Sequence, residues 1–317
     1  MKKHYRGPSF KQRRSMPHLF SPIRIGHLRL ANRLALQALP SGCAVPGGTV
    51  TRELVAYYRE RAQGVGLVVL EATYVVPPRD SLTPHIGLYA DAQLFALAHC
   101  INEIRRAGAA ALVMLDQPLW LAHASAAELD TIAAAFVAAA QRARTAGADG
   151  VMFSTADGGP MEQLVSPLQN QRTDQYGGRI GSRLRFLTDI VELIARRVGP
   201  DFVMGARLNA EEFAPGGLDM QESRLIATLL LSAGLALIEV GATKPHDALV
   251  AQFPGWQLPF AEGVKAVVDA PVMVGGLLDD PQLAESAIRD KSADLIAIGE
   301  RLKYDPAWPE RARAILT

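Results

Sequence analysis

The sequence predicts a single (β/α)8 barrel, because eight short apolar runs alternate with eight longer amphipathic runs over its 317 residues. Most of the short runs are continuously apolar, as expected for parallel strands that are buried on both faces. No linker or low-complexity segment interrupts the series, and single-domain barrels of this type commonly reach ~250 residues or more. A doubly wound open sheet is the alternative that the same pattern allows.

The predicted elements follow one another in order along the chain. The expected strands are Leu34–Leu39, Gly66–Val76, Ala111–Leu115, Gly150–Ser154, Phe202–Leu208, Leu235–Val240, Pro271–Val274 and Asp294–Ile298. The expected helices are Thr51–Gln63, Asp91–Ala107, Ala126–Ala146, Ile180–Arg197, Met220–Ala233, Phe260–Val268, Pro281–Lys291 and Pro306–Ile315. Several begin at residues that favour a helix start, such as Thr51, Asp91 and Asp280. In a barrel, the carboxyl ends of the strands carry the active site.

Composition excludes several classes of partner. The formal net charge of +1 and the pI of about 7.8 give no electrostatic case for a nucleic acid or an anionic membrane. Two cysteines, Cys43 and Cys100, make neither a disulfide framework nor a metal site, so we expect no metal and a reducing, cytoplasmic setting. No apolar run approaches the ~20 residues of a membrane helix. The basic segment 1–17 lacks the apolar core of a secretory signal and is expected to be a flexible tail before the barrel at 18–317.

A polar, glycine-containing motif after the fourth predicted strand connects the chain to a known family. The run SPLQNQRTDQYGGR from Ser166, followed by SRLRF, resembles a signature of the Old Yellow Enzyme family, and the resemblance extends from about Leu19 to Pro309. It implies a barrel that uses FMN and NAD(P)H to reduce a small enone or other carbonyl compound. Relatives form monomers, dimers and larger assemblies, so the resemblance leaves a homo-oligomer open.

The resemblance also implies a set of cofactor-binding positions. Ala72 corresponds to a residue that lies against the flavin, and Arg207 corresponds to an arginine beside the flavin N1–C2 edge. Gly275, Gly276 and Gly299 fall in the two turns that hold the FMN phosphate. These turns also have a physical reading of their own, because glycines between a strand end and a helix let backbone N–H groups approach an anion. Ordinary tight turns explain the same glycines.

Four departures from the family pattern fall in the expected site. Met114 replaces a glutamine that bonds the flavin pyrimidine edge, and methionine has no amide donor and acceptor. Ser154 and Asp157 replace the His pair that holds the substrate carbonyl. Glu300 replaces an arginine at the phosphate, and the excursion after the third strand, around 118–125, is short. We therefore expect FMN to bind weakly or not at all, and NAD(P)H only if FMN is bound.

Ser154 and Asp157 are the candidate catalytic residues, as a hydrogen-bond donor and a general base, although both residue types are also common in turns. Glu71 and Asp116 are expected to be an acid and a base or partners of barrel arginines such as Arg207. The preferred function is flavin-independent isomerisation, dehydration or cyclisation of a small carbonyl compound. The alternatives are an FMN-dependent NAD(P)H ene-reductase with unusual flavin ligands and a non-catalytic barrel that binds a small molecule or a partner.

Overall fold

The predicted barrel is confirmed. The computed structural model describes residues 16–243 and 249–317, and its eight central parallel strands close on themselves through the pairing of β3 with β4. Around the barrel these strands are β3 (Leu34–Leu36), β11 (Leu295–Ile298), β10 (Val272–Val274), β9 (Leu237–Gly241), β8 (Val203–Asn209), β7 (Gly150–Thr155), β6 (Ala110–Asp116) and β4 (Leu67–Tyr74). Every strand lies within a residue or two of its predicted start.

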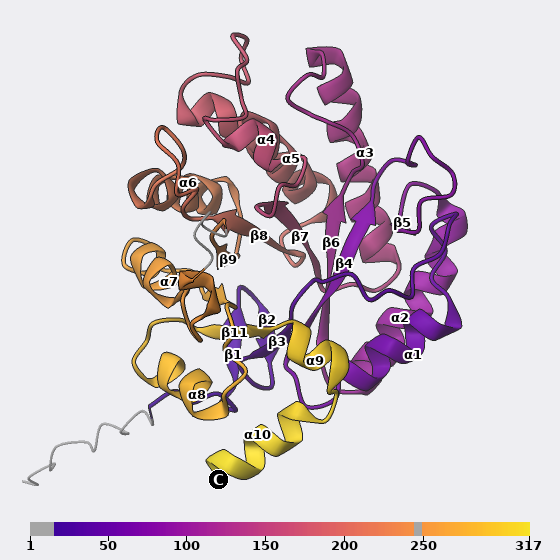
Figure 1. Cartoon of the computed structure of the whole chain (residues 1–317). Helices are drawn as coiled ribbons and strands as arrows, with labels where there is room; N and C mark the ends of the chain where they lie inside the picture. Colours follow the sequence, from indigo (N-terminus) through magenta and orange to yellow (C-terminus); the bar gives the residue numbers. More distant parts are fainter. Residues whose placement is uncertain (1–15, 244–248) are drawn as a thin grey trace, which may run out of the picture.

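Helices surround the strands as an outer layer (Figure 1). They are α1 (Arg52–Arg61), α2 (Leu94–Arg106), α3 (Ala126–Thr145), α5 (Ile180–Val198), α6 (Met220–Ala233), α7 (Leu258–Lys265), α8 (Pro281–Arg289) and α10 (Trp308–Leu316). Thr51, Ser125, Asp219 and Asp280 each accept a hydrogen bond from a backbone N–H in the first turn of the following helix, which satisfies a donor that has no partner inside the helix. Asp91 instead begins the short 3-10 helix η1 (Asp91–Gln93), which leads into α2.

Short elements are the ones that the sequence pattern missed. The hairpin of β1 (Ile23–Ile25) and β2 (Leu28–Leu30) places Ile25 and Leu30 in the same buried cluster as the barrel interior. The remaining short elements are β5 (Ile86–Gly87), α4 (Glu162–Val165), η2 (Val250–Gln252) and α9 (Glu300–Tyr304). Segments of two to five residues are too short to show a helical or strand period.

The barrel interior is apolar in its lower layers and polar at the top. Leu67, Leu112, Met152, Val203 and Leu237 belong to one buried cluster inside the strands. Because side chains alternate between the two faces of a strand, the next inward positions toward the carboxyl ends include polar groups. This change from apolar to polar side chains positions the candidate site. None of the described helices is long and apolar enough to cross a membrane.

Candidate active site

Arg207 and Glu239 form the centre of the polar layer at the barrel mouth. They are paired across the parallel strands β8 and β9. Arg207 lies four residues beyond the interior residue Val203, and Glu239 lies two residues beyond the interior residue Leu237, so both point into the barrel. Arg207 Nη1 lies 3.3 Å from Glu239 Oε1. Gln37, which follows β3, donates from Nε2 to the same oxygen at 2.7 Å. Two side chains, one from β8 and one from the residue after β3, therefore converge on one carboxylate of β9.

Glu239 is fully buried, and its Oε2 has no hydrogen-bond partner among the described residues. Burial raises the pKa of this carboxyl above its usual range, and the nearby Arg207 charge opposes that rise. A buried carboxylate with one unsatisfied oxygen costs free energy unless a neighbour compensates it. Arg207 and Gln37 provide that compensation on only one of the two oxygens.

Asp157 contacts the opposite side of the Arg207 guanidinium. Its Oδ2 lies 3.0 Å from Nε, and its Oδ1 accepts from Nη2 at 3.3 Å. The Asp157 side chain is 59 % exposed, whereas that of Arg207 is 12 % exposed. One guanidinium thus faces two carboxylates, and the local charge is negative when both are ionised.

The loop after β7 holds Asp157 in an unusual backbone conformation. Asp157 has φ of 61°, in the left-handed region that aspartate tolerates better than most side chains. Glu162, buried in α4, accepts from Gly158 N at 2.5 Å and from Asn209 Nδ2 at 2.6 Å. Burial raises the pKa of Glu162, and these hydrogen bonds oppose the rise. Glu162 therefore fixes the loop that presents Asp157.

Ser154 shares this loop but does not touch Asp157. Its Oγ lies 3.3 Å from Ala156 O and 3.4 Å from Ala156 N, both long hydrogen bonds within the turn. The structure therefore brings Asp157 to Arg207 and leaves the Ser154 hydroxyl with weak local partners.

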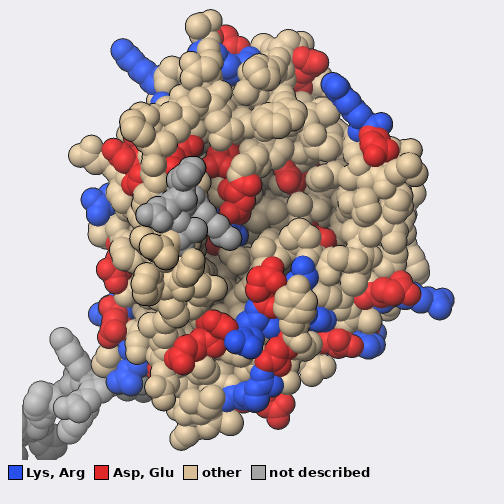
Figure 2. Space-filling view, viewed as in Figure 1, with Lys and Arg blue, Asp and Glu red and all other residues tan. Residues whose placement is uncertain are grey.

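A cleft of about 480 Å³ opens beside this cluster. Its lining combines Arg207 and Asp157 with both predicted phosphate turns, at Gly276 and Gly299, and with the charged residues Asp279, Glu300 and Arg301. The backbone N–H groups of Gly276 and Gly299 donate no hydrogen bond to the described part of the chain. The face shown in Figure 2 is hollowed near its centre, and acidic side chains gather around the hollow. The volume is typical of a small-molecule site.

The side chains at the two turns carry both positive and negative charges, unlike an anion-binding site that is lined by cations alone. Arg301 Nη2 lies 2.8 Å from Asp279 Oδ2, so this cation already has a partner. Glu300 is the first residue of α9 and is exposed. Backbone N–H groups, rather than a free arginine, are therefore the available anion donors here.

The other predicted positions lie around the same mouth. Ala72 is exposed although it sits within β4, which leaves its face of the strand end open. Met114 is only 5 % exposed, inside the barrel, and Gly275 is buried between Gln37 and Ala297. Gly275 does not line the cleft as Gly276 and Gly299 do.

Neither Glu71 nor Asp116 pairs with Arg207. Glu71 accepts hydrogen bonds from Ser41 N at 3.2 Å and from the Tyr58 hydroxyl at 3.3 Å. Asp116 accepts from Gln117 N at 2.8 Å, and burial raises the pKa of this carboxyl to about 6. The carboxylate partners of Arg207 in the structure are instead Asp157 and Glu239.

The signature motif after β7 has the structural role that its composition favours. Asn170 is buried and donates to the carbonyls of Leu164 and Tyr176, at 2.5 and 2.7 Å. Arg172 Nη1 donates to Ala122 O at 3.2 Å and to Ala124 O at 2.5 Å, in the segment that follows β6. The motif therefore ties two long loops together at the barrel mouth.

Sequence reasoning missed Glu239 and Gln37. Each is a single polar residue within an otherwise apolar strand segment, LIEVG and LALQAL. That interruption was the available signal, because a charged residue in a buried strand needs a partner. His246, which follows the sixth predicted strand, lies outside the described residues. Within 16–243 and 249–317, no cluster of three or more His, Cys, Asp or Glu side chains is arranged to hold a metal ion.

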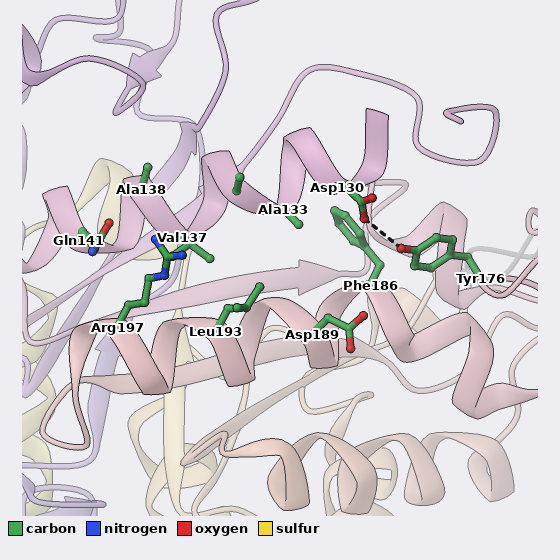
Figure 3. A pocket seen from close by; sticks show the side chains of 11 residues that line it. Asp130, Ala133, Val137, Ala138, Gln141, Tyr176, Phe186, Asp189, Leu193 and Arg197 are labelled. Carbon is green, nitrogen blue, oxygen red and sulfur yellow. Dashed lines mark hydrogen bonds between the residues drawn. The ribbon is translucent and has the colours of Figure 1, made fainter. Parts of the chain in front are cut away.

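A separate groove of about 310 Å³ lies between α3 and α5, on the outer helical layer (Figure 3). Asp130, Tyr176 and Asp189 stand at one end, and Gln141 and Arg197 at the other. Tyr176 donates to Asp130 at 3.5 Å. The groove is away from the strand ends, where barrel enzymes carry their chemistry, so the cleft at the mouth is the stronger candidate.

Comparisons with known proteins find relatives that align with most of the chain. An NADH oxidase of Thermoanaerobacter brockii is 32% identical over 94% of this chain and 51% of its own length. An NADPH dehydrogenase of Geobacillus thermodenitrificans is 29% identical over 93% of each chain. The chain thus spans about half of the first relative and of a metal reductase of Desulforamulus reducens, but nearly all of the NADPH dehydrogenase.

Solved structures show the same fold. Morphinone reductase in complex with tetrahydroNAD superposes with a TM-score of 0.79 at 26% identity, over 95% of this chain and 92% of that one. A 2-naphthoyl-CoA reductase complex gives a TM-score of 0.85 at 23% identity over 94% of this chain and 52% of the other, a likeness of fold alone. A profile of the NADH:flavin oxidoreductase / NADH oxidase family matches residues 18–118 and 116–317. The chain belongs to this family, which includes the Old Yellow Enzymes and depends on FMN.

Proposed function

We propose that this protein is an FMN-dependent oxidoreductase that takes electrons from NAD(P)H and reduces a small carbonyl-type compound. One observation carries the proposal: a single cleft joins Arg207 to the two glycine turns at Gly276 and Gly299. These are the positions at which the family resemblance places the flavin edge and the FMN phosphate. The flavin-free function preferred from the sequence thereby becomes the second candidate.

The residues at the phosphate end of the cleft are suited to hold the FMN phosphate. Gly276 has φ of 88°, where any other residue is strained, and a Cβ there would lie 3.0–3.1 Å from Gln257. At Gly299, a Cβ would lie 2.6 Å from Leu39 Cδ1 and 2.8 Å from Gln37 Oε1. Gly276 therefore requires glycine, whereas a side chain at Gly299 would have to displace the ends of the Leu39 and Gln37 side chains. The free N–H groups of both turns are suited to phosphate oxygens.

The pyrimidine end fits less completely. Arg207 is present, but Asp157 and Glu239 already contact it. Met114 offers no hydrogen bond where relatives have an amide. FMN, when bound, supplies the hydride transfer, and Arg207 would hold its N1–C2 edge. The exposed Asp157 and the weakly bonded Ser154 would face the substrate. We infer that the flavin is held mainly through its phosphate.

The second candidate is flavin-independent acid–base chemistry. Its supporting observation is the exposed carboxylate of Asp157, which is anchored beside a cation on a rigid loop. A carboxylate in such a place is suited to remove a proton from a carbon next to a carbonyl group. In this case Arg207 would stabilise the resulting enolate oxygen.

An absorbance spectrum of the purified protein, saturated with FMN and then desalted, separates the two. We expect a retained flavin band that NADPH bleaches and an enone restores. Gly299→Ala should remove that band, whereas Gly181→Ala should keep it, because a Cβ at Gly181 meets no atom within 4 Å. Thermal melts of both variants check that each is folded. A colourless wild-type protein that still converts a carbonyl substrate, and stops when Asp157 is replaced, would favour the second candidate.

A further inference from the structure

A second cavity of about 520 Å³ lies beside the barrel mouth, between the loop after β4, the segment after β6 and the first turns of α3. Val76, Pro118, Leu119 and Ile132 form apolar parts of its lining. Pro118 is only two residues beyond the end of β6, so the cavity begins next to the mouth. Its volume lies within the ordinary range of small-molecule sites.

Trp120 lines this cavity and is 69 % exposed. By contrast, Trp308 is 5 % exposed in the core, and Trp256 packs edge-on against Phe260. A tryptophan left in water forgoes the burial that normally stabilises it, and such residues are enriched where a ligand completes their packing.

The backbone on both sides of Trp120 is firmly held. The buried Gln117 donates to Leu119 O at 2.6 Å and accepts from Leu119 N at 2.7 Å. The buried Gln163 accepts from Leu121 N at 3.0 Å, and Leu121 is fully buried. Arg172 holds the carbonyls of Ala122 and Ala124. The exposed indole is therefore presented by a preorganised segment, which lowers the entropic cost of binding.

Two basic side chains and one carboxylate line the cavity, and hydrogen bonds from Ser125 together with the charge of Arg79 lower the pKa of Glu128. Arg79 and His123 line the cavity and form no ion pair or side-chain hydrogen bond with the described residues. Glu128 also lines it, but its Oε2 accepts from Ser125 N at 2.7 Å and from Ser125 Oγ at 2.8 Å in a capping box. Asp80, next to Arg79, accepts from Leu82 N at 2.9 Å within its own turn. The amino-terminal end of the 20-residue α3 adds a positive dipole.

We infer that this cavity binds a planar heteroaromatic ring that carries an anionic group, and that its occupant is the adenosine phosphate end of NAD(P)H. The ring stacks on Trp120, and the phosphate lies against Arg79 and His123. The identity of the occupant rests on the proposed function, whereas the chemistry of the ligand rests on the cavity alone. Proteins that bind nucleotides without base specificity commonly stack the base on an aromatic side chain and contact the phosphate with a basic side chain.

The test measures tryptophan fluorescence while 2′,5′-ADP or ADP is added to the protein without nicotinamide or enone. We expect saturable quenching that weakens at higher ionic strength, because the phosphate contact is partly screened. Trp120→Phe should remove most of the signal, and calorimetry should show that Trp120→Ala weakens binding about tenfold or more. Arg79→Gln should weaken binding to a similar extent.

Matched controls come from other parts of the surface. Two exposed residues of α2 line none of the cavities described above. Phe95 is 88 % exposed, and the side chain of Arg106 is 77 % exposed. Phe95→Ala and Arg106→Gln should leave nucleotide binding unchanged. Equal affinity for ADP in wild type and Trp120→Ala would overturn the inference. Tighter binding of 1-naphthoate than of ADP at the same place would also overturn it, because the preferred ligand would then be an aromatic acid rather than a nucleotide.

The outcome is separable from that of the proposed function. If the protein retains no FMN but binds ADP through Trp120, the proposed function fails and the cavity assignment stands. If NADPH reduces bound FMN with the same KM in wild type and Trp120→Ala, the proposed function stands and the cavity assignment fails.

Discussion

The buried carboxylate of Glu239 lies 3.3 Å from the Arg207 guanidinium, and its second oxygen has no partner among the described residues. Asp157 contacts the same guanidinium from the solvent side. The arginine that a flavin or an enolate would use is thus already opposed by two carboxylates. The electrostatics of the candidate site therefore depend on these neighbours as much as on Arg207.

Glu239→Gln should tighten FMN binding by about tenfold or more. The substitution removes a negative charge but keeps the shape, and a unit charge pair at ~4 Å with an effective dielectric near 20 is worth ~4 kcal/mol. The reduction potential of bound FMN should rise as well, because loss of the negative charge stabilises the anionic reduced flavin more than the oxidised flavin. Flavin fluorescence titration and a redox titration measure the two effects. Equal affinity and potential in wild type and variant would show that Glu239 is neutral in the folded protein.

Asp157→Asn separates the two candidate functions. Asparagine tolerates the left-handed backbone at this position, so only the charge changes. Under the proposed function, FMN affinity should increase because Arg207 loses a competing carboxylate. The thermal stability should change little, because the Asp157 side chain is mostly exposed. Loss of turnover in a flavin-free preparation, with no change in FMN affinity, would contradict this expectation.

Asp116 should make the protein less stable as the pH rises. Its folded-state pKa of about 6 lies above its ordinary value of 3.8 because of burial, so the folded state binds the proton more tightly than the unfolded state. Stability contributed by the protonated form is present below pH 3.8 and is lost as the pH rises to about 6. The difference between the two pKa values corresponds to a change of at most ~3 kcal/mol in the free energy of unfolding.

Asp116→Asn should remove that pH dependence. The amide oxygen can still accept from Gln117 N, and no charge is buried. Urea unfolding at pH 4 and pH 8 should give a variant that resembles wild type at pH 4 and is more stable at pH 8. Asp201→Asn, at an exposed position, serves as the control and should show no such change. A parallel pH profile for Asp116→Asn and wild type would refute the assignment.

Asn170→Ala should destabilise the loops at the mouth. The side chain is buried and bonds two carbonyls and the N–H of Arg172. Leaving such groups unsatisfied costs ~1–3 kcal/mol each. Urea unfolding should show a loss in that range, and protease sensitivity around residues 164–176 should increase. Gln169→Ala, at the exposed neighbouring position, should have little effect.

The sequence by itself determined the barrel and the end of it at which the candidate site lies. Strand runs such as GVMFS and helix starts such as Thr51 are local signals, because backbone hydrogen bonding and side-chain period depend on residues close in the chain. The same local patterns placed Arg207, Gly276 and Gly299 near strand ends.

Tertiary structure alone decided which charges meet. Arg207 and Glu239 are 32 residues apart, and Gln37 and Glu239 are 202 apart. Their contacts arise only when the barrel closes and sets the register of its strands. Glu71 and Asp116 seemed equally suitable partners in the sequence, but their side chains find nearer hydrogen-bond donors. The exposure of Trp120 is likewise a tertiary property, because it depends on which surfaces the anchored loops leave uncovered.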